Sequence, residues 1–258
     1  MAGGDGAMAM TPHVLIVAGS DSSGGAGMAR DIETVSAFGL RSCLAVTAVT
    51  VQTHAAVERI DQMPPELIAA QMRAAFAANQ VAAVKIGMLG TAAAIEAVGS
   101  VLADNHRVPV VIDPVLASTS GRVLLEVDAI NALRRNLMPV CRLVTPNLLE
   151  LATLTGSDPA PDEESACLQG EELSRTIGTA VLVKGGHAQG AYAVDVLLQP
   201  NRAATRFEAP RLHRGMRGTG CMLSSAIAAS FALGFSLEQS VRRGKQFVFD
   251  VLARSVMS

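Results

Sequence analysis

Short apolar runs alternate with longer segments of helical periodicity along most of this chain. The runs are continuous and rich in Val rather than alternating with polar residues, which is typical of strands buried on both faces. They cover His13–Ala18, Leu44–Val51, Ala83–Ile86, Val108–Ile112, Leu143–Thr145 and Ala180–Val183. Helical segments cover Ala26–Phe38, Pro65–Ala78, Ala92–Asp104, Asp128–Leu137, Asn147–Thr155 and Glu163–Ile177. This order predicts an α/β fold with a mostly parallel central sheet, flanked by helices on both faces.

The pattern changes after Gly185. The segments Tyr192–Leu198 and Ala204–Glu208 read as an antiparallel hairpin that turns at Pro200 and Asn201. Two further helices are expected at about Cys221–Leu233 and Leu237–Val256. No internal repeat or long linker divides the sequence, so residues 12–258 are predicted to form one domain. Residues 1–11 are small and polar, and they are expected to be a flexible tail rather than a signal peptide.

Composition narrows the classes of function. Half of the 258 residues are apolar and the net charge is −2, with no basic tract that would favour nucleic acid as a partner. No apolar run is long and clean enough to span a bilayer, so no membrane partner is expected. The four cysteines, Cys43, Cys141, Cys167 and Cys221, form no C-x-x-C pair and have no accompanying His cluster. So few cysteines indicate a reducing, cytoplasmic setting.

Ligands of open α/β sheets bind at the carboxyl ends of the strands, so the loops there are the candidate site. The stretch Arg217–Cys221 reads R-G-T-G-C and leads directly into a helix. Glycines allow close backbone approach, and a helix start offers free N–H groups with a partial positive charge, so this loop is suited to an anion. The alternative is an ordinary glycine turn before a helix. No G-x-x-x-x-G-K-[ST] motif occurs, which argues against a P-loop enzyme.

Asn147 and Glu150 form a second candidate, since they share one face of a first helical turn. Their oxygens suit a hydrated Mg²⁺. The same Asn-x-x-Glu spacing is also a capping pattern, with Glu150 reaching back to the helix start.

Three further strand ends carry candidate chemistry. The loop Gly19–Gly27 is rich in glycine and serine but lacks the G-x-G-x-x-G spacing of dinucleotide sites. Lys184 leaves a buried strand where it can meet a phosphate, or it is a surface lysine with a buried stem. Asp113 ends another strand, as a functional acid or as a loop cap. His187, soon after Lys184, is more typical of a turn residue than of a catalyst.

Taken together and in order, these loops resemble one family, the hydroxymethylpyrimidine/phosphomethylpyrimidine kinases of thiamine biosynthesis in the ribokinase superfamily. The resemblance runs from about Val14 to about Leu233. It is carried by Ala18–Gly27, Lys85–Leu89, Asp113–Val115, Thr145–Glu150, Val183–His187 and Gly218–Cys221. It implies a ribokinase-like fold, ATP with Mg²⁺ and a homodimer. It also implies phosphorylation of the hydroxymethyl group of 4-amino-5-hydroxymethyl-2-methylpyrimidine and, in bifunctional members, of the resulting monophosphate.

The resemblance also implies roles for individual residues. Those expected at the pyrimidine are Ala26, Gln52, Met88, Val115 and Asp31. Lys184 is expected to meet the ATP phosphates, with Asn147 and Thr219 also at the nucleotide, and Asp113 and Glu150 to hold Mg²⁺. Gly218 and Gly220 would form the anion hole. Cys221 stands where many relatives have an Asp as general base, and a helix start is expected to lower its thiol pKa.

Two stretches depart from the family pattern. Arg217 stands where His is usual before G-T-G-C, and it is expected either to contact phosphate or to point to solvent. Thr53–Val57 replaces the usual Asn-Thr-x-Gly-Val after Gln52, which leaves the substrate range open. The alternatives are a pyridoxal or pyridoxine kinase of the same superfamily, whose substrate also carries a hydroxymethyl group, and a non-catalytic regulator that binds a ligand. Joint presence of Lys184, Asp113, Glu150 and Cys221 argues against the regulator.

Overall fold

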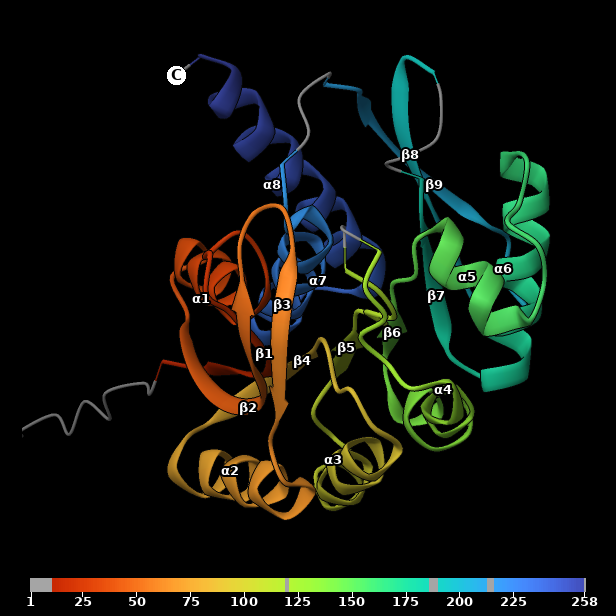
Figure 1. Cartoon of the computed structure of the whole chain (residues 1–258). Coiled ribbons are helices and arrows are strands. Elements are labelled where there is room, and N and C mark those ends of the chain that lie inside the picture. The colour runs from red at the N-terminus through yellow and green to blue at the C-terminus, as the bar shows by residue number, and fades with distance from the viewer. Residues whose placement is uncertain (1–10, 119–120, 186–189, 213–215, 258) are drawn as a thin grey trace, which may run out of the picture.

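A computed structural model describes residues 11–118, 121–185, 190–212 and 216–257. Its framework is one nine-stranded sheet with the strand order β3-β2-β1-β4-β5-β6-β7-β8-β9 (Figure 1). The strands are β1 (His13–Asp21), β2 (Arg41–Gln52), β3 (Val57–Gln62), β4 (Val81–Ile86), β5 (Val110–Ile112), β6 (Leu143–Val144), β7 (Ala180–Lys184), β8 (Tyr192–Leu198) and β9 (Thr205–Pro210). The helices are α1 (Gly27–Ala37), α2 (Pro65–Ala78), α3 (Ala92–Asp104), α4 (Val127–Ala132), α5 (Leu148–Thr155), α6 (Glu163–Ile177), α7 (Thr219–Ala232) and α8 (Leu237–Met257).

The centre of the sheet is parallel and its margins are antiparallel. Strands β1, β2, β4, β5, β6 and β7 pair in parallel, whereas β3, β8 and β9 pair antiparallel. The predicted parallel strands and the β8–β9 hairpin are therefore confirmed, including its turn at Asn201, whose φ is +59°. The sequence did not predict β3, because most side chains of this edge strand are exposed and it lacks the apolar run of a buried strand.

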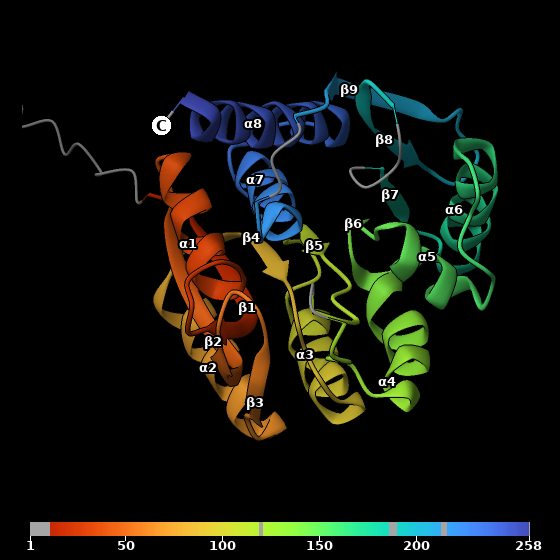
Figure 2. The same cartoon turned by 45° about the horizontal axis from the view of Figure 1, so that its top comes forward.

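The sheet is covered on both faces, as predicted (Figures 1 and 2). Alternate residues of β1 point to opposite sides: Leu15 and Val17 belong to the core beneath α2 to α6, and Val14 and Ile16 to the core beneath α1, α7 and α8. Burial of both strand faces explains why these runs are continuously apolar. The helix expected at Asp128–Leu137 is present as α4, followed by a π-helical turn, Leu133–Leu137.

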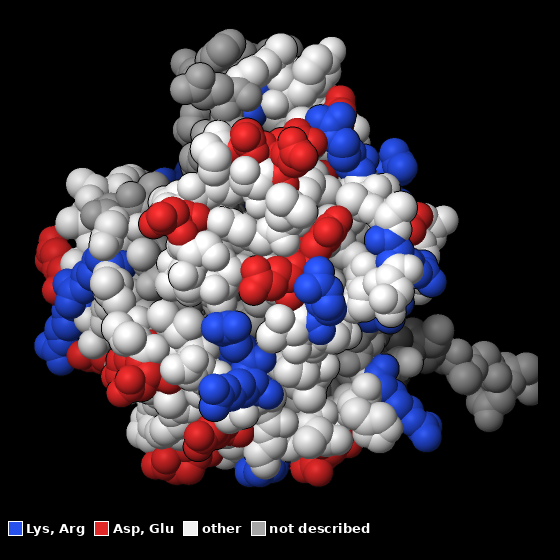
Figure 3. All heavy atoms as spheres, turned by 90° about the vertical axis from the view of Figure 1, so that its right-hand side faces the viewer, with Lys and Arg blue, Asp and Glu red and all other residues white. Residues whose placement is uncertain are grey.

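Charged residues of both signs are mixed on the face that carries α5 and α6 (Figure 3). Arg206, for example, pairs with Glu163 at 2.7 Å and with Glu208 at 2.8 Å, and all three side chains are exposed. Such surface pairs contribute about 0–1 kcal/mol each, so they add little to the stability of this face. None of the helices in the described ranges is both long and apolar enough to cross a membrane.

Candidate active site

The carboxyl ends of the parallel strands meet at one edge of the sheet, and the start of α7 lies at the same edge. Lys184 is the last residue of β7, and Asp113 follows β5 directly. Asn147 lies next to Lys184 through an isolated parallel bridge. This arrangement brings together side chains from three loops that are far apart in the sequence.

Lys184 lies between two carboxylates. Its Nζ is 2.5 Å from Asp113 Oδ1 and 3.8 Å from Glu150 Oε2. The side chain is only 13% exposed, so it is not the surface lysine of the alternative interpretation. Burial works to lower the pKa of Lys184, but Asp113 and Glu150 outweigh it and raise the pKa above its ordinary value. A fixed positive charge is therefore present at this edge across the physiological pH range.

The two acids have different surroundings. Asp113 Oδ1 also receives a hydrogen bond from Thr145 Oγ1 at 3.3 Å. Glu150 completes a capping box with Asn147: the Asn147 N–H donates to Glu150 Oε2 (2.8 Å), and the Glu150 N–H donates to Asn147 Oδ1 (2.9 Å). The capping interpretation is therefore confirmed. Burial and the Asp113 charge raise the pKa of Glu150 to about 7, against the opposing effect of Lys184.

These carboxylates fit a magnesium ion that is bound mainly through phosphate and water. Within the described residues no group of three or more His, Cys, Asp and Glu side chains forms a metal site. Mg²⁺ does not need such a group, because it keeps several waters and takes one or two carboxylates together with substrate phosphates. Asp113 and Glu150, which both approach Lys184, supply that donor set.

The loop before α7 reaches the Lys184 cluster. Gly218 has φ +77°, a left-handed conformation that favours glycine, and it is the N-cap of the helix. A Cβ at Gly218 would lie 2.5 Å from the Gly25 carbonyl oxygen, and a Cβ at Gly220 would lie 3.2 Å from Lys184 Nζ. The first N–H groups of α7, including that of Thr219, thus lie close to the buried cation of Lys184. An anion placed there would meet both, as the anion-hole hypothesis requires.

Cys221 lies in the first turn of α7, but its thiol pKa moves in the direction opposite to the one predicted. Burial raises the pKa of Cys221 to about 11, with Asp31 and Asp113 acting in the same direction. The Lys85 charge and a backbone hydrogen bond from Gly27 lower it, and they do not compensate. The expectation of a lowered pKa was wrong because the helix start is only a partial charge, and the protein packed around the thiol disfavours its charged form more strongly.

A buried ion pair lies behind Cys221. Lys85 Nζ and Asp31 Oδ2 are 2.7 Å apart, and both side chains are fully buried. Ser225, one helical turn after Cys221 on α7, donates to Asp31 Oδ1 at 2.8 Å. Asp31 was expected at the pyrimidine, but both of its oxygens are bonded inside the protein, so it supports α1 and α7 from behind the site. Removing one partner of such a pair typically costs about 3–5 kcal/mol.

Two of the other expected pyrimidine residues, Ala26 and Met88, lie near the end of β1 and the loop after it. Ala26 is the N-cap of α1, and its Cα would be 3.1 Å from a Cβ at Gly218. Met88 is nearly buried, with its sulfur 3.4 Å from the position of a Cβ at Gly19. Val115 follows Asp113 closely and is partly exposed.

Gln52, at the end of β2, is held through its backbone. Ser22 Oγ donates to the Gln52 carbonyl and accepts from the Gln52 N–H, both at 2.8 Å. Thr50 Oγ1 gives its one proton to the Ser20 carbonyl at 2.7 Å, so its 3.3 Å contact with Gln52 Oε1 leaves that oxygen able to accept from a ligand.

A family model described as phosphomethylpyrimidine kinase matches residues 21–257. A hydroxymethylpyrimidine/phosphomethylpyrimidine kinase of Rhizobium meliloti is 41% identical over 245 residues, which cover 95% of this chain and 91% of the relative. The chain belongs to the phosphomethylpyrimidine kinase family. Other matching relatives are named thiamine biosynthesis bifunctional or multifunctional proteins, and this chain covers 48% and 32% of two of them.

Solved structures agree with the ribokinase-like fold. The phosphomethylpyrimidine kinase of Clostridium difficile superposes with a TM-score of 0.81 at 33% identity, covering 93% of this chain and 99% of that one. A Bacillus subtilis pyridoxal kinase in complex with ADP gives a TM-score of 0.83 at 28% identity, covering 92% and 90%. Kinases of both kinds therefore share this architecture.

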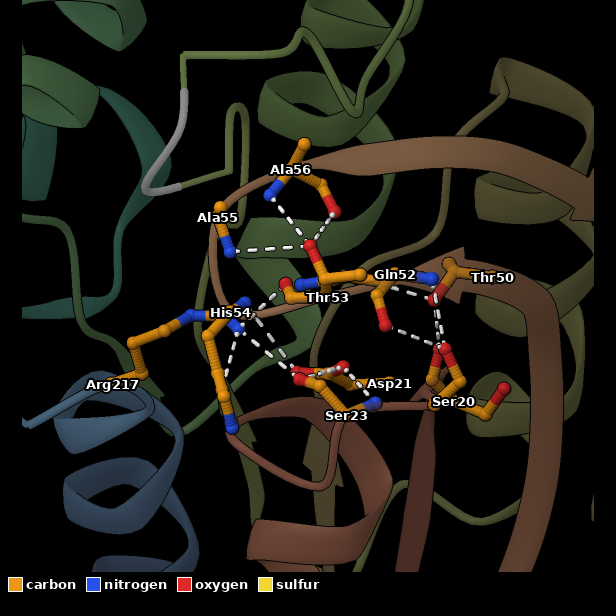
Figure 4. Close-up of polar contacts among 11 residues, drawn as sticks. Ser20, Asp21, Ser23, Thr50, Gln52, Thr53, His54, Ala55, Ala56 and Arg217 are labelled. Carbon is orange, nitrogen blue, oxygen red and sulfur yellow. Dashed lines mark hydrogen bonds and ion pairs between the residues drawn. The ribbon is translucent and has the colours of Figure 1, made fainter.

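Of the two positions expected for Arg217, the structure excludes the one directed to solvent, because the side chain is only 21% exposed. It contacts Asp21 and Ser23 on one loop and Thr53 and His54 on another (Figure 4). His187 lies outside the described residues.

Sequence reasoning also missed two polar residues. Thr145 lies beside Asp113. Asp195 accepts a hydrogen bond from the Gly185 N–H at 3.0 Å and pairs with Lys245 at 2.8 Å. An acid between Val194 and Val196 on a strand was the available sign of a buried polar contact.

Proposed function

We propose that this protein transfers the γ-phosphoryl group of ATP to the hydroxymethyl group of 4-amino-5-hydroxymethyl-2-methylpyrimidine. The monophosphate is then phosphorylated to the pyrophosphate, in thiamine biosynthesis. The observation that carries the proposal is the contact of Lys184 with Asp113 beside Gly220, in the first turn of α7. A buried cation, two acids and a helix start in one place suit phosphoryl transfer, which depends mostly on positioning and charge stabilisation.

The positively charged groups and the acids of the site have different roles. Lys184 and the first N–H groups of α7 stabilise the negative charge on the transferring phosphoryl group, and Asn147 and Thr219 lie at the nucleotide. Asp113 and Glu150 are the oxygen ligands for Mg²⁺, which neutralises phosphate charge when bound. The hydroxymethyl oxygen forms the new P–O bond while the bond from the γ-phosphorus to the ADP oxygen breaks.

The hydroxymethyl proton must leave as that bond forms, and we assign its acceptance to the Cys221 thiolate. Because the pKa of Cys221 is about 11, only a small fraction is thiolate at neutral pH. This gives the assignment a signature: kcat should rise with pH, approaching ~10-fold per unit between pH 7 and 9. A flat profile, together with wild-type kcat in Cys221→Ser, would leave the anion hole alone as the function of this loop.

Gln52 is proposed to recognise the pyrimidine through hydrogen bonds. Its amide offers an acceptor beside a donor, and the aminopyrimidine edge offers the complementary pair. Pyridoxal lacks that amino group. The second candidate activity, pyridoxal kinase, is supported by the close superposition on the Bacillus subtilis enzyme. Gln52 favours the pyrimidine, because a site built to hydrogen-bond one group discriminates against analogues that lack it.

Product analysis by mass spectrometry tests the proposal. Purified protein is incubated with MgATP and either hydroxymethylpyrimidine or pyridoxal, and phosphorylated products are quantified. Mono- and pyrophosphate of the pyrimidine are expected to form faster than pyridoxal phosphate. Faster formation of pyridoxal phosphate would transfer the assignment to the second candidate, and no product from either substrate would support the non-catalytic regulator. Lys184→Ala serves as the inactive control.

The cellular location and the oligomeric state belong to the same proposal. All four cysteines are free thiols, which supports a reducing cytoplasm. The exposed apolar side chains Val49 and Val51 on β2, in the part of the strand that pairs with the edge strand β3, support a homodimer. Light scattering coupled to size-exclusion chromatography would give twice the chain mass for the dimer.

A further inference from the structure

One guanidinium group joins two loops that are far apart in the sequence. Arg217 Nη1 donates to Ser23 Oγ and to the Thr53 carbonyl, each at 3.1 Å, and lies 3.4 Å from His54 Nδ1. Its Nη2 is 3.5 Å from Asp21 Oδ2. Figure 4 shows Arg217 between these two groups of residues. The planar fork of an arginine can reach both loops at once, which a single-point cation cannot do.

Each of the two loops is ordered within itself. In the turn between β2 and β3, which we call the flap turn (Thr53–Ala56), the Thr53 N–H donates to the Ala56 carbonyl at 2.9 Å. Thr53 Oγ1 accepts from the N–H groups of Ala55 (3.3 Å) and Ala56 (3.2 Å). On the other loop, Asp21 Oδ1 accepts from the N–H and the hydroxyl of Ser23. The flap turn is therefore held together by its own hydrogen bonds, and the pairing of β2 with β3 shifts register directly before it, at Val51/Gln52.

A third loop meets the other two at the same point. A Cβ at Gly25 would lie 3.3 Å from both Arg217 Nη1 and His54 Nδ1, so the absence of a side chain there makes room for the contact. Gly218, which follows Arg217, packs on the Gly25 carbonyl. The start of the anion hole, the loop after β1 and the flap turn are thus fastened together. Arg217 and His54, which are 163 positions apart in the sequence, contact each other.

We propose that Arg217 is a positioning residue that holds the flap turn against the loop after β1 and so sets the orientation of Gln52 for the substrate. Gln52 is adjacent to the flap turn. Its backbone is also hydrogen-bonded to Ser22, on the same loop that Arg217 contacts. Within the described residues, the hydrogen bonds and the ion pair of Arg217 are all with these two loops, which border Gln52. Its effect is therefore on binding of the acceptor substrate, not on phosphate. This inference rests on the proposed function.

Hydrogen–deuterium exchange combined with kinetics tests the inference. Arg217→Gln should increase exchange of the Gln52 amide in the unliganded protein, because this N–H donates to Ser22 on the opposite loop. It should raise KM for the hydroxymethylpyrimidine by ~10-fold, because the apparent affinity falls with the fraction of protein in the competent state. KM for ATP and kcat should stay within about twofold. Arg217→Lys, which keeps the charge but not the fork, should fall between the wild type and Arg217→Gln.

Arg59→Gln is the matched control, since Arg59 lies on β3 of the same hairpin and forms only an exposed ion pair with Asp61. It should change neither exchange nor KM. Unchanged exchange at Gln52 in both folded Arg217 variants would overturn the inference. So would a fall in kcat with a higher KM for ATP while the flap turn stays protected, because that pattern belongs to a phosphate ligand. Failure of the proposed function is recognised separately, as a wild-type protein that forms no product although the exchange result holds.

Discussion

The thiol of Cys221 should react with alkylating reagents much more slowly than its place at a helix start suggests. Burial raises its pKa from 9.0 to about 11. The thiolate, which is the reactive form, is thereby reduced about 100-fold at neutral pH. A more basic thiolate is a better nucleophile, and a Brønsted slope of ~0.4–0.5 over two pKa units returns about tenfold. The net expectation is a rate about tenfold below that of an ordinary thiol, before any loss from restricted access.

The assay is the rate of carbamidomethylation by iodoacetamide between pH 7 and 10, followed peptide by peptide by mass spectrometry. Peptide resolution is needed because burial also raises the pKa of Cys43 and Cys167, which are partly exposed and can react. The logarithm of the Cys221 rate should rise with slope ~1 throughout this range, because the pKa lies above it. Cys221→Ser removes the signal and confirms its assignment. A plateau below pH 8.5 would refute the reasoning, since it would show that the helix start dominates over burial.

Three further predictions concern Lys184, Glu150 and Gln52. Lys184→Ala should lower kcat by at least ~10²-fold with the fold retained, measured by steady-state kinetics and circular dichroism; near-normal turnover would remove Lys184 from the site. Because the pKa of Glu150 is about 7 and Mg²⁺ binds the carboxylate, the Mg²⁺ concentration for half-maximal rate should increase as the pH falls from 8 to 6. Glu150→Gln can still accept the capping hydrogen bond, so it should raise that concentration and abolish its pH dependence; an unchanged magnesium titration would leave Glu150 as a cap only. Gln52→Leu should lower kcat/KM for the hydroxymethylpyrimidine by ~10-fold or more, about 1.4 kcal/mol, and change pyridoxal turnover much less; equal losses would show that Gln52 only supports the loop.

Most of the helices and strands could be predicted from the sequence, because burial in a parallel α/β fold determines the pattern of apolar residues within each segment. Strands covered on both faces must be apolar at every position, so β1 and β7 could be found from the sequence alone. The same topology places strand ends at one edge, so Asp113 and Lys184 could be assigned to one site before their 2.5 Å contact was seen. The strand β3 had no such pattern, because an exposed edge strand does not need an apolar run.

Only the tertiary structure decided how the polar groups affect one another. The sequence placed Cys221 at a helix start, but the direction of its pKa shift depends on how much water the surrounding elements exclude. Asp31 and Lys85 are 54 positions apart, and Arg217 is 164 positions from Thr53, so neither contact leaves a periodic pattern along the chain. Burial and periodicity are properties of a segment, and a sequence can express them. Desolvation and pairing between distant loops are properties of the assembled core, and they exist only once the chain has folded.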